Sequence, residues 1–209
     1  MNDRPWLNDL EAVDTRSIDQ LACEIRDDFQ IGLASFTAVF TPDLDYVLLV
    51  QLGDYARRFY DGNPWTLPGG GVKAGESPSM SAIREVKEET AVELADLELS
   101  IAGWFSRKYY QSRHAEAKGE IVLLFATSLR ERLPVTPNRP EVINACYERM
   151  DVKEWLQVPA SGTGQHRLQP FPRHWIHWAV QARSVLAGES KVSVVQYENA
   201  GEMAEPISP

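Results

Sequence analysis

Residues 67–92 read LPGGGVKAGESPSMSAIREVKEETAV, a glycine-rich loop that runs into a short acidic helix. Ser77 and Pro78 predict where the helix begins, because a serine oxygen can accept a backbone N–H at the N-cap and proline at the first helical position has no N–H to lose. We expect the helix to end near Thr90. The stretch therefore predicts a loop-to-helix unit with a defined first residue.

The two sides of this helix differ in character at about 100° per residue. One side collects small or apolar side chains with a methionine at its edge, namely Ala82, Ile83, Val86, Thr90 and Met80. Glu85, Glu88 and Glu89 cluster on the opposite side. We therefore expect one face to pack in a core and the other to present three carboxylates.

Carboxylates at this spacing repel one another, by roughly 0.2–0.5 kcal/mol per pair. A hard divalent cation would offset the repulsion, since magnesium and manganese prefer oxygen ligands. A main-chain carbonyl of Gly69 or Gly70 could join these ligands, because glycine lets the backbone come close. Glu76 can form an ion pair with Arg84 beside the acidic face, so we interpret these two residues as structural support for the site rather than as metal ligands. The alternative for the acidic run alone is a solvated helix face.

The spacing across the whole stretch resembles the signature of the Nudix hydrolase family, Gly-x5-Glu-x7-Arg-Glu-U-x-Glu-Glu-x-Gly-U, in which U is a bulky aliphatic residue. Residues 70–92 match every fixed position except one, since Ala91 stands where the family has glycine. That glycine serves the helix exit, so we expect alanine to lower local stability without abolishing activity. So many polar constraints rarely coincide by chance, which favours a metal site over a solvated face.

The resemblance implies an α/β/α sandwich built on a mixed β-sheet, which the order of the expected elements also permits. It implies Mg²⁺ or Mn²⁺ as the cofactor, with metal ligands Gly70, Glu85, Glu88 and Glu89. Glu88 and Glu89 are expected to be the principal ligands, and Glu85 a ligand or the acceptor of the proton from the attacking water. In the family a glutamate ahead of a later strand often supplies a further ligand or base. Its position favours Glu141 for that catalytic role, with Glu120 and Glu148 as alternatives.

Two other interpretations of the glycine loop fail on chemistry. Residues 70–77 have the spacing of a phosphate-binding loop, but Glu76 stands where that loop requires lysine, and an acid there would repel phosphate. A dinucleotide-binding fingerprint that starts at Gly69 meets Ala74 in place of its last glycine, and no parallel βαβ repeat follows.

Composition limits the class of protein. The chain has 209 residues, a hydrophobic fraction of 44% and a net charge of −9. This supports one globular domain with peripheral arms and gives no basic stripe for a polynucleotide. Cys23 and Cys146 lie in no CxxC motif, and neither a leader-like start nor a membrane-length apolar run is evident. We expect a cytoplasmic protein without a membrane partner.

Four regions are expected along the chain. They are an N-terminal arm with an amphipathic helix at 1–30, the Nudix hydrolase domain at 31–160, a C-terminal helix packed on that domain at 161–190, and a flexible tail at 191–209. Residues 17–20 predict a capping box for the first helix, whose role we interpret as structural or as the interface of a homodimer. Strands are expected at 31–40, 46–52, 98–105 and 120–129, the first two as a hairpin. Asp151 predicts a second capping box, and Trp175 and Trp178 belong to the C-terminal helix.

Two loops carry candidate substrate-binding residues. Arg57 and Arg58 lie in a loop that ends at the metal site, where they can bind phosphate or carboxylate or simply pair with surface acids. Arg107, Tyr109 and Tyr110 belong to a cationic, aromatic loop, in which stacking on a nucleobase would contribute about 1–3 kcal/mol. A tyrosine near this offset resembles the marker of the family's diadenosine polyphosphate branch, although a strand-end tyrosine explains it equally well.

The expected activity is metal-assisted hydrolysis of a phosphoanhydride bond in a nucleoside diphosphate linked to another group, such as a nucleotide sugar, ADP-ribose or a dinucleoside polyphosphate. An alternative that uses the same signature is a nucleoside triphosphate pyrophosphohydrolase of the pool-cleaning type. An alternative from another class is a module that senses a nucleotide without cleaving it. Such a module would be expected to lose acids from the helix, whereas this chain keeps them. In each case the partner is a small-molecule nucleotide.

Overall fold

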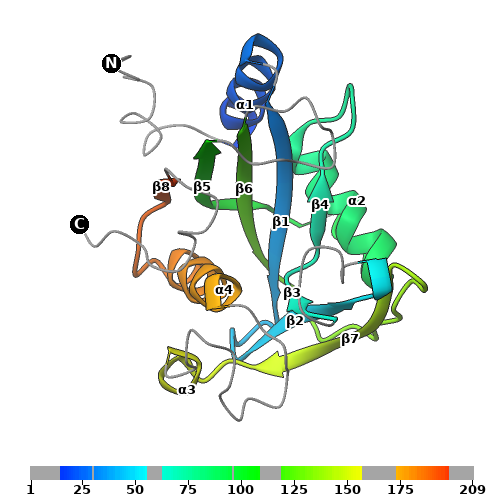
Figure 1. The fold of residues 1–209 in the computed structure, drawn as a ribbon. Coiled ribbons are helices and arrows are strands. Elements are labelled where there is room, and N and C mark those ends of the chain that lie inside the picture. Colours follow the sequence, from blue (N-terminus) through cyan, green and yellow to red (C-terminus); the bar gives the residue numbers. More distant parts are fainter. Residues whose placement is uncertain are drawn as a thin grey trace.

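The computed structural model describes residues 15–29, 31–55, 63–95, 97–108, 119–156 and 173–197. The helices are α1 (Thr15–Phe29), α2 (Pro78–Thr90), α3 (Val152–Leu156) and α4 (Arg173–Leu186). The strands are β1 (Gly32–Phe40), β2 (Tyr46–Leu52), β3 (Trp65–Thr66), β4 (Gly69–Gly71), β5 (Ser100–Lys108), β6 (Gly119–Ser128), β7 (Val142–Arg149) and β8 (Ser193–Tyr197). Figure 1 shows their arrangement.

The strands form one mixed, eight-stranded sheet. Its main order is β3-β2-β1-β6-β5-β8, with β4 paired to β1 and β7 paired to β2. β1 and β6 run parallel along their whole length, whereas β5 and β6 are antiparallel. β1 therefore lies in the middle of the sheet, with β6 along one edge and the short β4 along the other.

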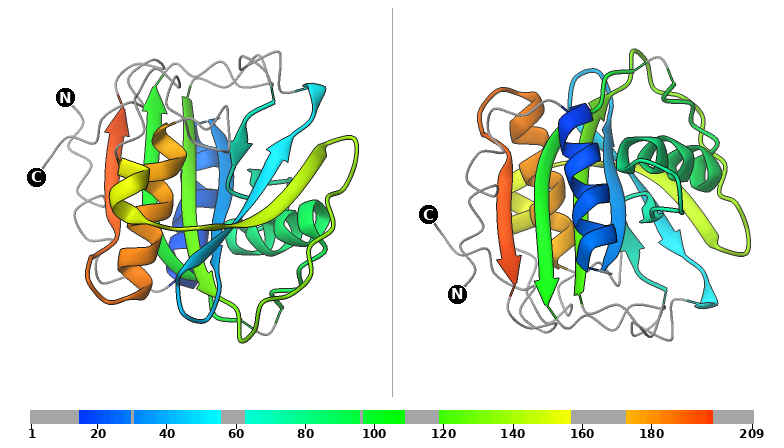
Figure 2. Two further views of the ribbon diagram at one scale, coloured as in Figure 1. Left: turned by 90° about the horizontal axis from the view of Figure 1, so that it is seen from below. Right: turned by 90° about the horizontal axis from the view of Figure 1, so that it is seen from above.

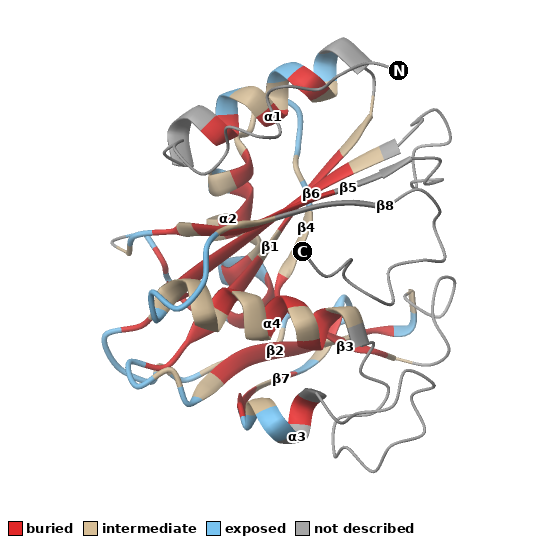
Figure 3. Cartoon of the chain, turned by 90° about the vertical axis from the view of Figure 1, so that its left-hand side faces the viewer, coloured by how far each residue is buried: buried red, intermediate tan, exposed pale blue. Residues whose placement is uncertain are grey.

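Helices cover both faces of this sheet. Figure 2 shows α1 and α2 over one face and α4 over the other. The side chains of β1 alternate accordingly, because Leu33 and Val39 join the core cluster under α1 and α2, while Ala38 and Phe40 join the cluster under α4. Figure 3 shows buried residues along the strands and on the helices that cover them. The predicted α/β/α sandwich with a mixed sheet is confirmed.

The predicted hairpin of β1 and β2 is realised at one end only. The strands pair antiparallel as predicted, with Phe40 opposite Val47, and then separate. β4 pairs with β1 at residues 34–36, and β3 pairs with β2 at Val50 and Gln51. Residues 65–71 therefore fill the split between β1 and β2, which places the glycine loop inside the sheet.

The first helix begins two residues before the predicted capping box at Ser17. Gln20 donates to Glu24 Oε1 at 2.8 Å, and Asp19 binds residues of α2, so these side chains are engaged elsewhere. The capping-box prediction at residues 17–20 is therefore wrong. The second predicted cap is present, since Asp151 Oδ1 accepts a hydrogen bond from the Lys153 N–H at 3.0 Å at the start of α3.

The end of the described chain belongs to the sheet. β8 pairs in parallel with β5 from Ser193 opposite Gly103 to Tyr197 opposite Arg107. The prediction of a flexible tail is therefore wrong for residues 193–197, because β5 supplies these residues with backbone hydrogen-bonding partners that the local sequence does not reveal. None of the helices in the described segments has the length and apolar character needed to cross a bilayer.

Candidate metal and catalytic site

The helix α2 begins and ends as the residue types dictate. Ser77 is the N-cap, and its side chain accepts a hydrogen bond from the Met80 N–H, while Pro78 takes the first helical position. At the other end Ala91 adopts the left-handed conformation, with φ 61° and ψ 13°, and its N–H donates to the Lys87 carbonyl. The family's glycine would adopt this geometry without strain, so alanine here carries a local steric penalty.

The apolar face of α2 differs in part from the predicted one. Ala82, Val86 and Thr90 are buried as expected, and Ile83 is half-buried. Met80 is 61% exposed, so its predicted place at the edge of the core is wrong. The side chain of Ser81, which is fully buried, accepts a hydrogen bond from Arg84, and this contact keeps a polar residue inside.

The glycine loop is held tightly against β1. A Cβ added to Gly69 would lie 2.3 Å from the Ser35 carbonyl oxygen, so only glycine fits at this position. A Cβ added to Gly70 would lie 2.8 Å from Glu85 Oε1. The absence of side chains at 69 and 70 therefore brings the loop backbone next to a carboxylate of α2.

Arg84 is the centre of a hydrogen-bond network around the acidic helix. Its Nε and Nη2 donate to the two carboxylate oxygens of Glu76 at 2.7 and 2.9 Å, a bidentate pair. Its Nη1 donates to Glu85 at 2.7 Å and to Glu88 at 3.0 Å. Arg84 also reaches the Gly71 carbonyl at 3.3 Å. One guanidinium thus ties the loop to two of the three acidic side chains, which agrees with a supporting role for Glu76 and Arg84.

These contacts divide the carboxylates electrostatically. The hydrogen bonds from Arg84 hold the pKa of Glu76 below its ordinary value, against a smaller effect of burial. Burial raises the pKa of Glu85 in spite of its ion pair with Arg84. Glu76 is therefore set to remain an anion, whereas Glu85 is the more basic carboxylate.

Glu89 is the most deeply buried of the three clustered glutamates, with only 5% of its surface exposed. The charges of Glu85 and Glu88 nevertheless act on Glu89. Its Oε2 accepts a hydrogen bond from the Gly69 N–H at 2.9 Å. Burial raises the pKa of Glu89 well above its ordinary value, against that hydrogen bond and with further repulsion from Glu85 and Glu141.

Glu141 reaches the same region from a different part of the chain. The Thr136 N–H donates to the Thr90 carbonyl at 2.9 Å, and the Asn138 N–H donates to the Glu89 carbonyl at 3.4 Å. These bonds dock the segment before β7 on the end of α2. The negative charge of Glu141, which is exposed, contributes to the raised pKa of Glu85. The fold therefore brings Glu141 toward the acidic helix.

The two alternatives to Glu141 lie in strands. Glu120 is near the start of β6, opposite Gly32, and Glu148 lies in β7, opposite Val47. Glu148 is buried, with 7% of its surface exposed. Glu141 precedes β7 and is exposed, so of the three it has the position expected from the resemblance.

The residues fit a divalent cation by their chemistry. A carboxylate oxygen of Glu85 lies next to the backbone of Gly70, and one of Glu89 lies next to the backbone of Gly69. Carboxylate and carbonyl oxygens are the ligands that hard cations prefer. Among the described side chains no three His, Cys, Asp or Glu residues already converge as a metal centre. The Glu85 and Glu88 carboxylates accept hydrogen bonds from Arg84 at 2.7 and 3.0 Å.

The predicted substrate-binding residues fall largely outside the structural description. Arg57, Arg58, Tyr109 and Tyr110 lie beyond the described ranges. The backbone of Arg107 belongs to β5, opposite Glu120, and its side chain is not part of the described structure. These five residues stay predictions from the sequence.

One contact of the site has no signal in the local sequence. Asp19 of α1 accepts a hydrogen bond from the Ser79 N–H at 3.0 Å and another from the Ser79 hydroxyl. The two residues are far apart in the chain, and the sequence analysis gave Asp19 no role. Only the packing of α1 on α2 brings them together.

Comparison with known families agrees with this geometry. The model of the NUDIX domain matches residues 33–179. The chain belongs to the Nudix family. The match begins at β1 and includes the glycine loop, α2 and the first half of α4.

Relatives and solved Nudix structures resemble the chain to different extents. A Putative nudix hydrolase 1 of Caenorhabditis elegans is 38% identical over 69 residues, which is 31% of this chain and 18% of that protein. The NUDIX domain of Shewanella oneidensis NrtR, complexed with ADP ribose, superposes with a TM-score of 0.55 at 18% identity over 89% of this chain and 99% of that one. A NUDIX hydrolase from Nitrosomonas europaea gives a TM-score of 0.54 at 16% identity over 81% and 80%. These structural likenesses establish the shared fold.

Proposed function

We propose that this Nudix protein is a pyrophosphohydrolase that depends on Mg²⁺ or Mn²⁺. Its proposed substrate is a nucleoside diphosphate linked to another group, such as a nucleotide sugar, ADP-ribose or a dinucleoside polyphosphate. Water adds to a phosphorus atom, the bond from that phosphorus to the bridging oxygen breaks, and two phosphate-bearing products leave. The family match and the name of the curated relative support the class of reaction.

The observation that carries the proposal is the arrangement of α2 against the glycine loop. Arg84 binds Glu76, Glu85 and Glu88, and Glu89 is bound to the Gly69 N–H. A run of acids that served only as a solvated helix face would not need a buried carboxylate or an arginine shared among three acids. This arrangement supports a site built to hold ligand oxygens in fixed places.

The ligand oxygens would come from Glu85, Glu88, Glu89 and the Gly70 carbonyl. Bound divalent cations supply charge neutralisation at the phosphate oxygens. The raised pKa of Glu85, caused by burial, makes this carboxylate a suitable acceptor for the proton of the attacking water. Glu141 is a second candidate to accept this proton, since the segment before it docks on the C-terminal end of α2. Glu76 and Arg84 would keep Glu85 and Glu88 in place through the bonds described above.

The substrate class is tested by product analysis on a panel of ADP-ribose, nucleotide sugars, dinucleoside polyphosphates and nucleoside triphosphates. The bound ligand of the Shewanella oneidensis domain makes ADP-ribose the first compound to try. Release of nucleoside monophosphate from a diphosphate-linked substrate supports the proposal. Inorganic pyrophosphate as the main product would instead identify the triphosphate pyrophosphohydrolase.

The roles of the glutamates are tested by Glu88→Gln and Glu89→Gln, which keep the shape of the side chains and remove the charge. Each is expected to lower kcat by at least 10²-fold. Glu93→Gln is the matched control, because Glu93 follows the end of α2, is exposed and pairs with Lys87 at 2.7 Å. Full turnover in both Glu88→Gln and Glu89→Gln would contradict the proposal.

A sensing module remains the competing class. Tight nucleotide binding by the intact protein with added metal, without any turnover across the panel, would establish that class instead. We also propose a reducing, cytoplasmic setting, in which Cys23 and Cys146 remain thiols.

A further inference from the structure

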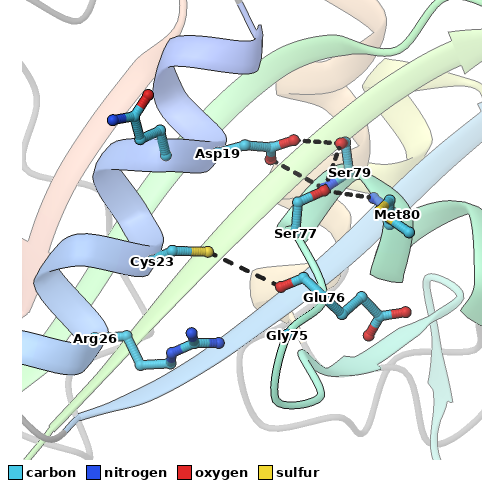
Figure 4. A pocket seen from close by; sticks show the side chains of 9 residues that line it. Asp19, Cys23, Arg26, Gly75, Glu76, Ser77, Ser79 and Met80 are labelled. Carbon is cyan, nitrogen blue, oxygen red and sulfur yellow. Dashed lines mark hydrogen bonds between the residues drawn. The ribbon is translucent and has the colours of Figure 1, made fainter.

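We propose that Asp19 of α1 is a positioning residue for the metal site, through its contact with the first turn of α2. The proposal deepens the proposed function and rests on it. Asp19 touches neither Glu85 nor Glu88 in the contacts described here, so its effect must be transmitted through the junction of loop and helix. Figure 4 shows this junction and the face of α1 that lies against it.

Asp19 caps α2 from another helix. Pro78 has no N–H, and the Ser77 hydroxyl accepts the Met80 N–H, which leaves the Ser79 N–H among the first donors of the helix. Asp19 Oδ1 accepts that N–H at 3.0 Å, and Oδ2 accepts the Ser79 hydroxyl. Asp19 is 8% exposed, so these bonds satisfy a largely buried carboxyl group at the positive end of α2.

A second contact fixes the residue that carries the supporting carboxylate. The Cys23 thiol, one turn after Asp19 on α1, donates to the Glu76 main-chain carbonyl at a sulfur–oxygen distance of 3.9 Å. Both side chains border a pocket of about 780 Å³ between α1 and the loop that ends in Ser77. α1 therefore contacts the backbone of residues 76 and 79, on both sides of the N-cap.

From Glu76 the connection to the metal site is direct. The Glu76 carboxylate accepts the Lys73 N–H at 3.1 Å and the bidentate pair from Arg84. Arg84 in turn holds Glu85 at 2.7 Å and Glu88 at 3.0 Å. A shift of the first turn of α2 relative to the loop would change the separation of Glu76 and Arg84. That change would release the two ligand carboxylates from their aligned positions.

The pocket beside this junction gives the first turn somewhere to move. Ser79, Met80 and Gly75 line it, so its walls on this side are the turn and the loop themselves. Without Asp19, the start of α2 can shift into this space instead of being stopped by packed side chains. Asp19 thus forms a polar contact between α1 and α2 at a place where side-chain packing is incomplete.

The experiment compares Asp19→Ala, Asp19→Asn and Glu24→Gln with the wild type in the full chain. Asparagine keeps an oxygen that can accept the Ser79 N–H, whereas alanine removes both acceptors. Glu24 lies on α1, is exposed and accepts from Gln20, which makes it the matched control. Mn²⁺ affinity is measured by electron paramagnetic resonance without substrate. Hydrolysis is then followed as a function of Mn²⁺ and of nucleotide, and thermal unfolding is recorded with EDTA.

Asp19→Ala is expected to raise the Kd for Mn²⁺ by roughly 10-fold, within the range for residues that orient metal ligands. It should lower kcat while the KM for nucleotide stays within about 2-fold. Asp19→Asn should recover most of the metal affinity, and Glu24→Gln should match the wild type.

Several results would overturn the proposal in different ways. A lower Tm for Asp19→Ala with wild-type Mn²⁺ affinity and kcat would make Asp19 a stabilising residue only, and the proposed function would stand. Should Asp19→Ala fail to fold, Ser79→Ala takes its place, because it removes the hydroxyl that donates to Asp19. Wild-type Mn²⁺ affinity and kcat in Ser79→Ala would then count against the positioning role. A wild type that binds no Mn²⁺ would overturn this inference and the proposed function together. A wild type that binds Mn²⁺ without hydrolysis would overturn the function, while the Mn²⁺ affinities would still decide the role of Asp19.

Discussion

Replacing Arg84 by alanine should destabilise the protein more than any other single change on the surface of α2. The side chain of Arg84 is 18% exposed, and those of its partners Glu76 and Glu85 are 12% and 15% exposed. Removing the guanidinium leaves two largely buried carboxylates without their cation. Breaking a buried ion pair in this way typically costs about 3–5 kcal/mol.

The lower end of this range is the appropriate value here. The third partner, Glu88, is 49% exposed, so water can take over part of its interaction. We expect a loss of roughly 3 kcal/mol in the free energy of unfolding, which corresponds to a fall of about 6–12 °C in Tm for a chain of this size. Arg84→Lys keeps the charge but not the bidentate geometry, so its loss should be about half as large.

The assay is urea denaturation followed by circular dichroism, with EDTA present so that metal binding does not contribute. Lys87→Ala is the matched control on the same helix, because Lys87 and its partner Glu93 are 58% and 62% exposed. Exposed pairs of this kind contribute about 0.2–1 kcal/mol. A loss below about 1 kcal/mol for Arg84→Ala, equal to that of Lys87→Ala, would refute the central place given to Arg84.

Three further predictions concern the glycine loop and the C-terminal end of α2. Ala91→Gly should raise the free energy of unfolding by about 0.5–1 kcal/mol in urea denaturation and leave kcat unchanged, because it relieves the left-handed conformation at φ 61°. Gly70→Ala should weaken Mn²⁺ binding in calorimetric titration by roughly 10-fold, since its Cβ would displace a Glu85 oxygen from 2.8 Å, whereas Gly71→Ala, whose Cβ meets nothing within 4 Å, should bind like the wild type. Burial raises the pKa of Glu89, so the folded metal-free protein retains a proton that the unfolded chain loses near the ordinary pKa of 4.5. Without metal, the protein should accordingly lose stability as pH rises from 4.5 through the raised pKa of Glu89. The increase in Tm that Mn²⁺ causes, measured by differential scanning fluorimetry, should therefore be larger at pH 8 than at pH 6. An equal increase in the wild type and in Glu89→Gln would contradict the role of Glu89 as a metal ligand.

Local patterns in the sequence were sufficient for α2 and for the strands β1, β2, β5 and β6. The N-cap at Ser77 depends on neighbouring residues only, and the alternation of Leu33 and Val39 with Ala38 and Phe40 follows from the pleat of a strand. The same holds for the spacing of the acids, which follows from helical winding. These features are encoded within a few residues, so they can be read without knowing the tertiary structure.

Features that depend on distant segments were not predictable in this way. Helical winding groups Glu89 with the other acids, but the Gly69 N–H and the docking of residues 136–138 decide that it is buried. Asp19 carries no local signal, and its role follows only from the packing of α1 against Ser79. The separation of β1 and β2 likewise results from the insertion of β3 and β4 between them. Each of these features depends on contacts between segments that are distant in the sequence, so it can be identified only in the folded chain.

The parallel pairing of β8 with β5 has a practical consequence for where the chain can be shortened. A chain that stops at residue 179, where the family match ends, would lose β8 and the second half of α4. The backbone of residues 103–107 would then present free N–H and carbonyl groups along an open strand edge, next to the buried rings of Trp104 and Phe105. Exposed edges of this kind recruit strands from other molecules, so fragments cut at that boundary should precipitate while chains extending past Tyr197 stay in solution.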